Sequence, residues 1–242
     1  MAHGYPDWAQ SAGVNTVYQL RDLAELAARL GSIDTFDRRG DVFHLQDFEH
    51  GDGSIDNDTS GDDAACGLSL VTSRSGSFSY RLKTGTDSDC YAEVDVYSVL
   101  PSLSCIGAEI SFAQLHDRGG FILALEIYTG EHIITPKIKY DYLTQKLYYW
   151  SDVLTWVEIG SVIRLPNSTK IFNTVKLVID CANMKYKRAI LGVNGYALAD
   201  VDCRYTASII AASIGLKFRH YGDTLTSKNS YADDVIFTQN EP

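Results

Sequence analysis

The feature that most constrains this chain is an alternation of apolar and polar side chains with a period of two residues, which begins at Ile33 and recurs almost to the end. It is clear in the stretches 78–83, 106–112 and 175–179. Successive side chains of a β-strand point to opposite faces, so each stretch predicts a strand with one face in a core. About a dozen such strands without intervening helices predict a mainly β chain, folded as an antiparallel two-sheet sandwich.

Turn residues separate these stretches. The clearest signal is 193–196, where Asn194-Gly195 is suited to the two positive φ angles of a type I′ hairpin turn. Further turns are expected at 118–120, 129–130 and 221–223. The polar stretch 51–63, rich in Asp, Gly and Ser, is interpreted as a loop.

Two acidic segments stand near the ends of the predicted β-region. The first is Asp47-Phe48-Glu49-His50-Gly51 and the second lies within Tyr231–Phe237. We expect them to belong to the first and last strands of one closed β-structure, with Phe48 close to Val235.

The beginning of the chain has a different pattern. Thr16-Val17-Tyr18-Gln19 has the spacing of a helix capping box, and Gly31 supplies a stop. We therefore predict one amphipathic helix over 17–30, preceded by an arm that contains Trp8. The predicted domains are an N-terminal arm and helix, 1–40, and a β jelly-roll domain, 41–242.

A single helix of this length is marginal in water, so its apolar stripe must dock on the sandwich or on a neighbouring subunit. The residues predicted to serve oligomerisation are Trp8, Leu23, Leu26 and Leu30. A homo-oligomer, or contact with other proteins of a particle, is the expected partnership.

Composition and charge exclude several classes of function. A net charge of −10 and a pI near 5.0, without a basic run, argue against nucleic-acid binding. No stretch has the length and apolarity of a membrane span, and residues 1–30 lack the features of a secretion signal. The expectation is synthesis in the cytoplasm. The five cysteines form no C-x-x-C pair and are expected to be reduced and structural.

Three short motifs resemble those of carbohydrate-binding jelly-roll modules. They are 47–51, 75–82 and 231–235, in this order and spacing. Concanavalin A-like and laminin-G-like sandwiches are similar as well, and the resemblance covers about 47–238, where it concerns fold more than activity. Residues 5–7 and 26–40 also resemble uncharacterised proteins encoded by phages and prophages.

The resemblance implies a structural calcium ion that ties the first strand to the last. The matching carboxylates are Glu49 and Asp234; the alternative is that both accept hydrogen bonds from N–H groups of turns. Asp56 and Asp58 match the first half of a calcium-binding loop, but Gly67 stands where a bidentate Glu is needed. The alternative for this pair is a solvated turn.

Glu93 and Asp95 resemble the start of the catalytic strand motif of laminarinase-type glycoside hydrolases. The two carboxylates share one face, but Tyr97 occupies the next position on that face and Ser98 points away. The acid/base Glu is missing, so hydrolysis is disfavoured. The alternative is an ordinary strand with two carboxylates on its solvent face.

Aromatic side chains gather between Tyr140 and Trp156. Sugars stack their C–H faces on flat rings, so Tyr148, Trp150 and Trp156 form a candidate carbohydrate-binding platform. The alternative is that these rings belong to the core and to a protein interface.

Three functions from different classes remain. The first is a non-catalytic structural or assembly protein, such as a capsid decoration or tail-associated component of a phage virion. The second is a carbohydrate-binding, lectin-like module or adhesin, and the third is a glycoside hydrolase. The sequence favours the first, because it accounts for the extra helix and for the absence of catalytic groups.

Overall fold

The structure is a computed structural model of the chain. It describes residues 39–50, 55–87, 89–115, 117–160, 164–198, 201–223 and 227–242, all of which belong to one compact unit, Arg39–Pro242. The predicted helix 17–30 and the four predicted oligomerisation residues, Trp8, Leu23, Leu26 and Leu30, lie outside the described residues.

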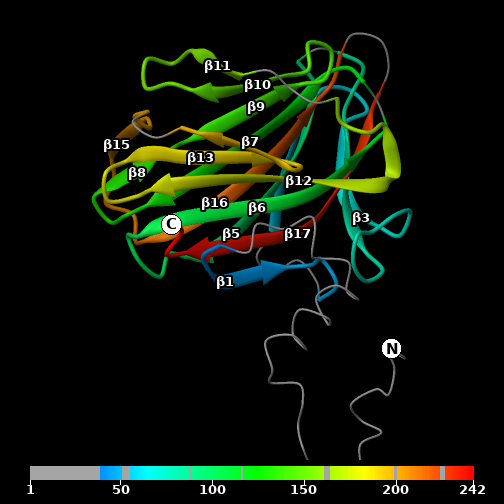
Figure 1. Ribbon diagram of the computed structural model, residues 1–242. Helices are drawn as coiled ribbons and strands as arrows, with labels where there is room; N and C mark the ends of the chain where they lie inside the picture. Colours follow the sequence, from blue (N-terminus) through cyan, green and yellow to red (C-terminus); the bar gives the residue numbers. More distant parts are fainter. Residues whose placement is uncertain are drawn as a thin grey trace, which may run out of the picture. The chain divides into compact units, whose positions relative to one another are not determined.

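The described chain forms two antiparallel sheets (Figure 1). The eight-stranded sheet has the order β14-β13-β12-β6-β17-β4-β3, and β1 also pairs with β17. Its strands are β1 (Asp41–Gln46), β3 (Ala65–Ser69), β4 (Ser79–Lys83), β6 (Cys105–Gln114), β12 (Ser168–Asp180), β13 (Lys185–Leu191), β14 (Asn194–Ala197) and β17 (Asn229–Gln239).

The nine-stranded sheet has the order β11-β10-β9-β7-β16-β5-β2, with β8 between β7 and β15. Its strands are β2 (Ile55–Ser60), β5 (Tyr91–Val99), β7 (Gly120–Tyr128), β8 (His132–Ile134), β9 (Lys137–Asp141), β10 (Lys146–Trp150), β11 (Trp156–Gly160), β15 (Tyr205–Ala207) and β16 (Ser213–Tyr221). The predicted two-sheet sandwich is confirmed. None of the described residues forms a helix suited in length and apolarity to crossing a membrane.

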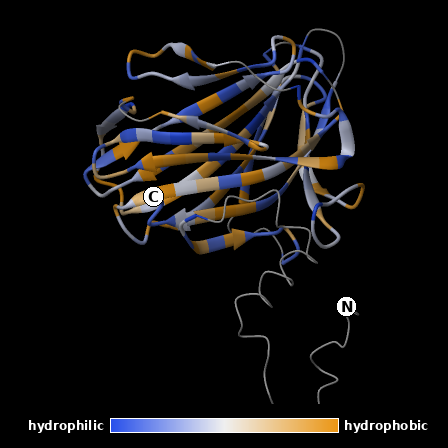
Figure 2. Ribbon diagram, viewed as in Figure 1, coloured by the Kyte–Doolittle hydropathy of each residue, from blue (hydrophilic) through white to orange (hydrophobic). Residues whose placement is uncertain are grey.

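The core lies between the two sheets and is built from alternate residues of their strands. Figure 2 shows hydrophobic and hydrophilic residues alternating along many of the arrows. At its centre Phe112 of β6 contacts Phe121 of β7 and Phe218 of β16, with ring centroids 4.8 and 5.3 Å apart. These aromatic contacts join the two sheets, because β6 belongs to one sheet and β7 and β16 to the other.

The central strands of the eight-stranded sheet are buried on both faces. Ile110 faces the core, but its neighbours Glu109 and Ser111 are also only 3% and 0% exposed, and Lys176 of β12 is 1% exposed. The outer face of this sheet is thus buried at its centre, where polar side chains such as Lys176 form ion pairs.

The first and last described strands pair, as the two acidic segments predicted. Gln46 of β1 lies opposite Val235 of β17. The register between β17 and β6 shifts between Asp233 and Ile236, and Asp234 has a φ of 46°. This bulge divides β17 into a half that pairs with β4 and a half that pairs with β1.

Two local predictions are wrong. The β13–β14 hairpin turns at Gly192-Val193, with Leu191 opposite Asn194. Gly192 has a φ of 59° and Val193 has no positive φ, which suits a type II′ turn, so Asn194-Gly195 begins the next strand. The stretch 51–63 is not all loop, because residues 55–60 form β2 and pair with β5.

The other turn predictions are confirmed. Residues 118–119 lie between β6 and β7, residues 129–130 between β7 and β8, and residues 222–223 follow β16. All five cysteines are free thiols.

Candidate functional site

The residues predicted to bind calcium both contact the segment 74–78, between β3 and β4. Glu49 Oε1 accepts hydrogen bonds from the N–H groups of Ser77 at 2.7 Å and Phe78 at 2.5 Å. Gly76, in this segment, has a φ of 59°, and a Cβ there would overlap the Glu49 carboxylate. The close approach of Glu49 therefore requires glycine at this position.

The bulge of β17 presents two carboxylates to the same segment. Asp233 Oδ2 accepts from the N–H of Arg74 at 2.6 Å, and Asp234 Oδ1 accepts from the Ser75 hydroxyl at 2.7 Å. The Arg74 guanidinium lies 3.5 Å from Asp234 Oδ2. Burial, followed by the neighbouring charge of Asp234, raises the pKa of Asp233 to about 7.

Glu49, which follows the first described strand, and Asp234, in the last strand, thus contact the same loop. Glu49 accepts hydrogen bonds from N–H groups of that loop, as the alternative interpretation expected, whereas Asp234 accepts one from the hydroxyl of Ser75. Among the described residues, no group of three or more His, Cys, Asp or Glu side chains is arranged to hold a metal ion. Calcium at Glu49 and Asp234 would depend on additional oxygen ligands and stays a prediction.

The second candidate calcium site loses its structural basis. Asp56 and Asp58 lie on β2, an extended strand, whereas a calcium-binding loop of this type must curl around the ion. Asp58 instead accepts a hydrogen bond from the Tyr91 hydroxyl at 2.7 Å. Calcium at this pair stays a prediction to which the strand geometry lends no support.

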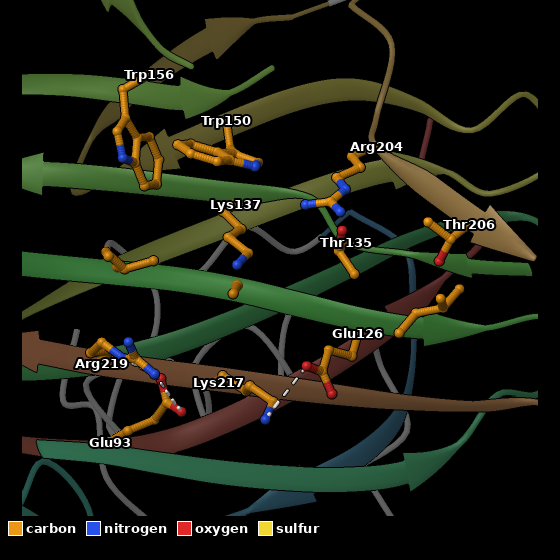
Figure 3. A pocket seen from close by; sticks show the side chains of 13 residues that line it. Glu93, Glu126, Thr135, Lys137, Trp150, Trp156, Arg204, Thr206, Lys217 and Arg219 are labelled. Atoms are coloured by element: carbon orange, nitrogen blue, oxygen red, sulfur yellow. Dashed lines mark hydrogen bonds and ion pairs between the residues drawn. The ribbon is translucent and has the colours of Figure 1, made fainter. Parts of the chain in front are cut away.

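A cavity of about 420 Å³ lies on the outer face of the nine-stranded sheet, away from the core. Its polar and aromatic lining is drawn in Figure 3. The lining residues lie on strands β5, β7, β8, β9, β10, β11, β15 and β16, apart from Thr135, which follows β8, and Arg204, which precedes β15: Glu93, Ile122, Ala124, Glu126, Ile133, Thr135, Lys137, Trp150, Trp156, Arg204, Thr206, Lys217 and Arg219.

Strand register explains why these side chains meet. In one row across the sheet Glu93 lies opposite Arg219, and Arg219 lies opposite Ile122. In the next row Lys217 lies between Asp95 and Ala124, and Ala124 is followed by Lys137. Alternate residues of each strand thus bring charged groups from far apart in the sequence to one face.

Two of the cations are paired. Arg219 forms a two-point contact with Glu93, with Nε–Oε2 at 2.7 Å and Nη2–Oε1 at 3.3 Å. Lys217 Nζ lies 3.0 Å from Asp95 Oδ2 and 3.5 Å from Glu126 Oε1. Burial lowers the pKa of Lys217, but the hydrogen bond and charge of Asp95 outweigh it, so that pKa is raised overall.

The glycoside-hydrolase motif lies in this face, but its two carboxylates are not on a solvent face as the alternative supposed. Glu93 and Asp95 are each 5% exposed, and both are engaged by cations of β16. Tyr97 follows on the same face, as predicted, and donates to Asp95 at 3.1 Å. Burial raises the pKa of Tyr97 to about 12.

Trp150 and Trp156 form one wall of the cavity. They lie opposite each other in β10 and β11, with ring centroids 4.8 Å apart and planes inclined by 62°. Tyr148 does not line the cavity, although Lys139 Nζ lies 5.0 Å from its ring centroid and 4.9 Å from that of Trp156. The predicted aromatic cluster is thus split, because Tyr140 and Tyr142 belong to the core.

Two further cations, Lys137 and Arg204, point into the cavity between the tryptophan pair and the charged row (Figure 3). Burial, and then the charge of Arg219, lowers the pKa of Lys137. The backbone of this residue is held by Tyr186, whose hydroxyl accepts from the Lys137 N–H at 2.8 Å and donates to the Trp150 carbonyl at 2.8 Å.

The cationic side chains of the cavity were not predicted as site residues. Lys137 and Lys139 alternate with apolar residues, as do Lys217 and Arg219, and this alternation assigns them to outer faces. It does not indicate that β9 and β16 flank the same strand, β7, which is a property of sheet order.

No protein-family model matches the chain. No curated protein matches it either. Among solved structures it is similar to an endo-β-1,4-glucuronan lyase from the fungus Trichoderma reesei, with a TM-score of 0.54 and 10% identity over 83% of this chain and 96% of that one.

Two further structures are similar in fold. A carbohydrate esterase from the Shiga toxin-encoding bacteriophage phi24B has a TM-score of 0.52 and 10% identity over 84% of this chain and 100% of that chain. A lectin from Bauhinia forficata, in complex with GalNAc, has a TM-score of 0.50 and 10% identity over 84% of this chain and 99% of its own. The resemblance to carbohydrate-binding and concanavalin A-like sandwiches is confirmed at the level of fold.

Proposed function

We propose that the chain is a carbohydrate-binding protein and that the cavity of the nine-stranded sheet receives the sugar. The observation that carries this proposal is the Trp150–Trp156 pair beside a charged cavity (Figure 3). Flat rings stack on the C–H faces of a sugar, and the adjacent Lys, Arg and Thr side chains supply partners for its hydroxyl groups.

The similar folds support this choice. One of the three proteins is named a lectin, another a lyase for a glucuronan and the third a carbohydrate esterase. Because folds of this kind host unrelated functions, the argument depends on the cavity rather than on these names. The proposal reverses the order of the first two hypotheses from the sequence.

The test is a glycan array probed with the full chain, followed by titration of each bound oligosaccharide. Trp150→Ala and Trp156→Ala are each expected to weaken binding about two- to thirteenfold, since stacking on one ring contributes about 0.5–1.5 kcal/mol. The control is Val193→Ala, at an 85% exposed position in the β13–β14 turn. Full binding by both tryptophan variants, with unchanged melting temperatures, would contradict the proposal.

An assembly role is the second candidate, and the similarity to a bacteriophage protein favours it. In this proposal the chain is a virion component that forms a homo-oligomer through its N-terminal segment. It is compatible with sugar binding, because an adhesin carried on a particle would use both properties.

Light scattering on the purified full chain tests the assembly role. We expect a mass of several chains, reduced to one chain by a combined Leu23→Asp and Leu26→Asp variant. A single-chain mass for the unaltered protein would remove this candidate.

Catalysis is the weaker interpretation of the same cavity. Glu93 and Asp95 are both held by cations, and the third group of the hydrolase motif is Tyr97. We propose a binding protein without hydrolase activity, which product analysis after prolonged incubation with the bound oligosaccharide tests.

A further inference from the structure

The cavity carries more positive than negative charge. Its lining contains four cationic side chains, Lys137, Arg204, Lys217 and Arg219, against two carboxylates, Glu93 and Glu126. Asp95, beneath Lys217, adds a third carboxylate. The distribution of these three carboxylates decides which cations are left for a ligand.

The two carboxylates of the lining lie beside Lys217 and Arg219, away from Lys137 and Arg204 (Figure 3). Arg219 forms an ion pair with Glu93, and Lys217 forms ion pairs with both Asp95 and Glu126. Within the part of the chain that the structure describes, neither Lys137 nor Arg204 has a carboxylate within ion-pair distance. Among the described residues, these two cations therefore face the cavity without a carboxylate in ion-pair contact.

An unpaired, half-buried cation is costly to the empty protein. Removing an ammonium group from water is unfavourable unless an anion compensates it. The pKa of Lys137 is lowered first by burial and then by Arg219, which means that its charged form is destabilised in this surrounding. An anionic ligand would remove this destabilisation.

We propose that the cavity selects an acidic glycan, an inference that rests on the proposed sugar-binding function. In the complex a sugar carboxylate lies between Lys137 and Arg204. The planar guanidinium of Arg204 matches the two oxygens of a carboxylate, and the ammonium of Lys137 adds a charged donor. Thr135 and Thr206 lie beside Arg204 and supply hydroxyl groups (Figure 3).

The charges of the surrounding sheet determine at which end of the cavity the carboxylate of the ligand binds. Beyond Glu93 and Asp95 the edge strand β2 adds Asp56 and Asp58, which lie opposite them in register. This acidic edge repels a second anion, so the carboxylate belongs at the β9 and β15 side. An oligosaccharide that is uncharged except for one terminal uronic acid fits this distribution of charge better than a uniformly charged chain.

The test compares three trisaccharides by titration calorimetry with the full chain. One ends in glucuronate, the second is its carboxyl-reduced counterpart ending in glucose, and the third carries a sulfate ester in place of the carboxylate. We expect the glucuronate form to bind at least tenfold more tightly than the other two, with an affinity that falls as salt rises from 50 to 500 mM.

The variants are Lys137→Met and Arg204→Met, with Lys170→Met, an exposed lysine of β12 in the other sheet, as the matched control. Each cavity variant is expected to lose about tenfold in affinity for the glucuronate form and nothing for the reduced form. The control should bind like the unaltered protein, and a melting curve of each variant checks folding.

The two proposals fail differently. Equal binding of the glucuronate and glucose forms, lost in Trp150→Ala, would overturn the charge selection and leave sugar binding intact. Tighter binding of the sulfate ester would overturn the carboxylate assignment. Binding of none of these trisaccharides, and of no glycan on the array, would overturn the proposed function itself.

Discussion

The outer faces of the two sheets both hold buried charges but use them differently. On the eight-stranded sheet Glu241 is enclosed by its donors: Lys176 at 2.7 Å, the Thr238 hydroxyl at 2.5 Å, and Arg188. On the nine-stranded sheet Lys137 and Arg204 face a cavity without a carboxylate partner in the described chain. A carboxylate that is saturated by protein donors stabilises the fold, whereas cations left open beside a cavity are available to a ligand.

The largest expected effect comes from a substitution of Glu241, the carboxylate at the centre of the buried network on the eight-stranded sheet. Glu241→Gln would remove the carboxylate charge that Lys176, 1% exposed, and Arg188 both contact, and we expect a loss of about 3–5 kcal/mol in the free energy of unfolding. Chemical denaturation measures it. Glu158→Gln, which breaks an exposed pair with Lys146, is the control and should leave the midpoint nearly unchanged.

If Glu241→Gln were as stable as the control, the network would not hold the C-terminal residues to the sheet. Glycan binding should survive in either variant, because Glu241 and Glu158 are not among the lining residues of the cavity.

A third polar region lies at the segment 74–78, where Glu49 and Asp234 are contacted. A chelator tests whether protein groups alone satisfy these carboxylates or whether calcium also does. A calcium ion at Glu49 and Asp234 predicts that a chelator lowers the melting temperature. With free calcium at 100 times its dissociation constant, the ion would contribute about 2.7 kcal/mol. An unchanged melting temperature in the chelator would leave hydrogen bonds from the loop as the role of both carboxylates.

A smaller effect is expected from Tyr186, which joins the two sheets beneath the cavity. Tyr186→Phe keeps the ring but leaves the Lys137 N–H without its acceptor, at a cost of about 1–2 kcal/mol in unfolding free energy. Because the same hydroxyl holds the Trp150 carbonyl, glycan affinity should fall as well. Tyr196→Phe, in β14, is the matched control; equal affinities of the two variants would show that Tyr186 does not position the site.

The smallest expected effect has the opposite sign. Lys137→Met removes a cation that burial destabilises, so the melting temperature should stay the same or rise by about 1–3 °C. A fall of several degrees would indicate that Lys137 supports the fold, and the contrast between the two sheets would be lost. Differential scanning calorimetry without ligand measures the change.

Much of the fold could be predicted because alternation reports directly on which residues face a core. It correctly assigned Ile106, Ile110 and Phe112 to buried positions. It failed at residues 55–60, where a polar edge strand has few apolar side chains to reveal its period. It also misplaced the hairpin turn, because Gly192-Val193 and Asn194-Gly195 are adjacent and both suit a two-residue turn.

The candidate site was predictable only in part. Trp150 and Trp156 were identified from their clustering along the chain, and they do lie together. Glu93 and Asp95 were recognised as sharing a face, but nothing in β5 itself indicates that Arg219 and Lys217 lie opposite them. Partners on strands more than 100 residues away depend on sheet order.

The sequence alone determined that this chain forms an antiparallel β-sandwich, because the period of two and the turn residues are local properties of the chain. Only the tertiary structure decided that Lys137 and Arg204 face a cavity, while Lys176 is buried in an ion pair with Glu241. The reason is physical: the energy of a charge depends on which groups surround it and how much water remains, and both are set by contacts between distant strands.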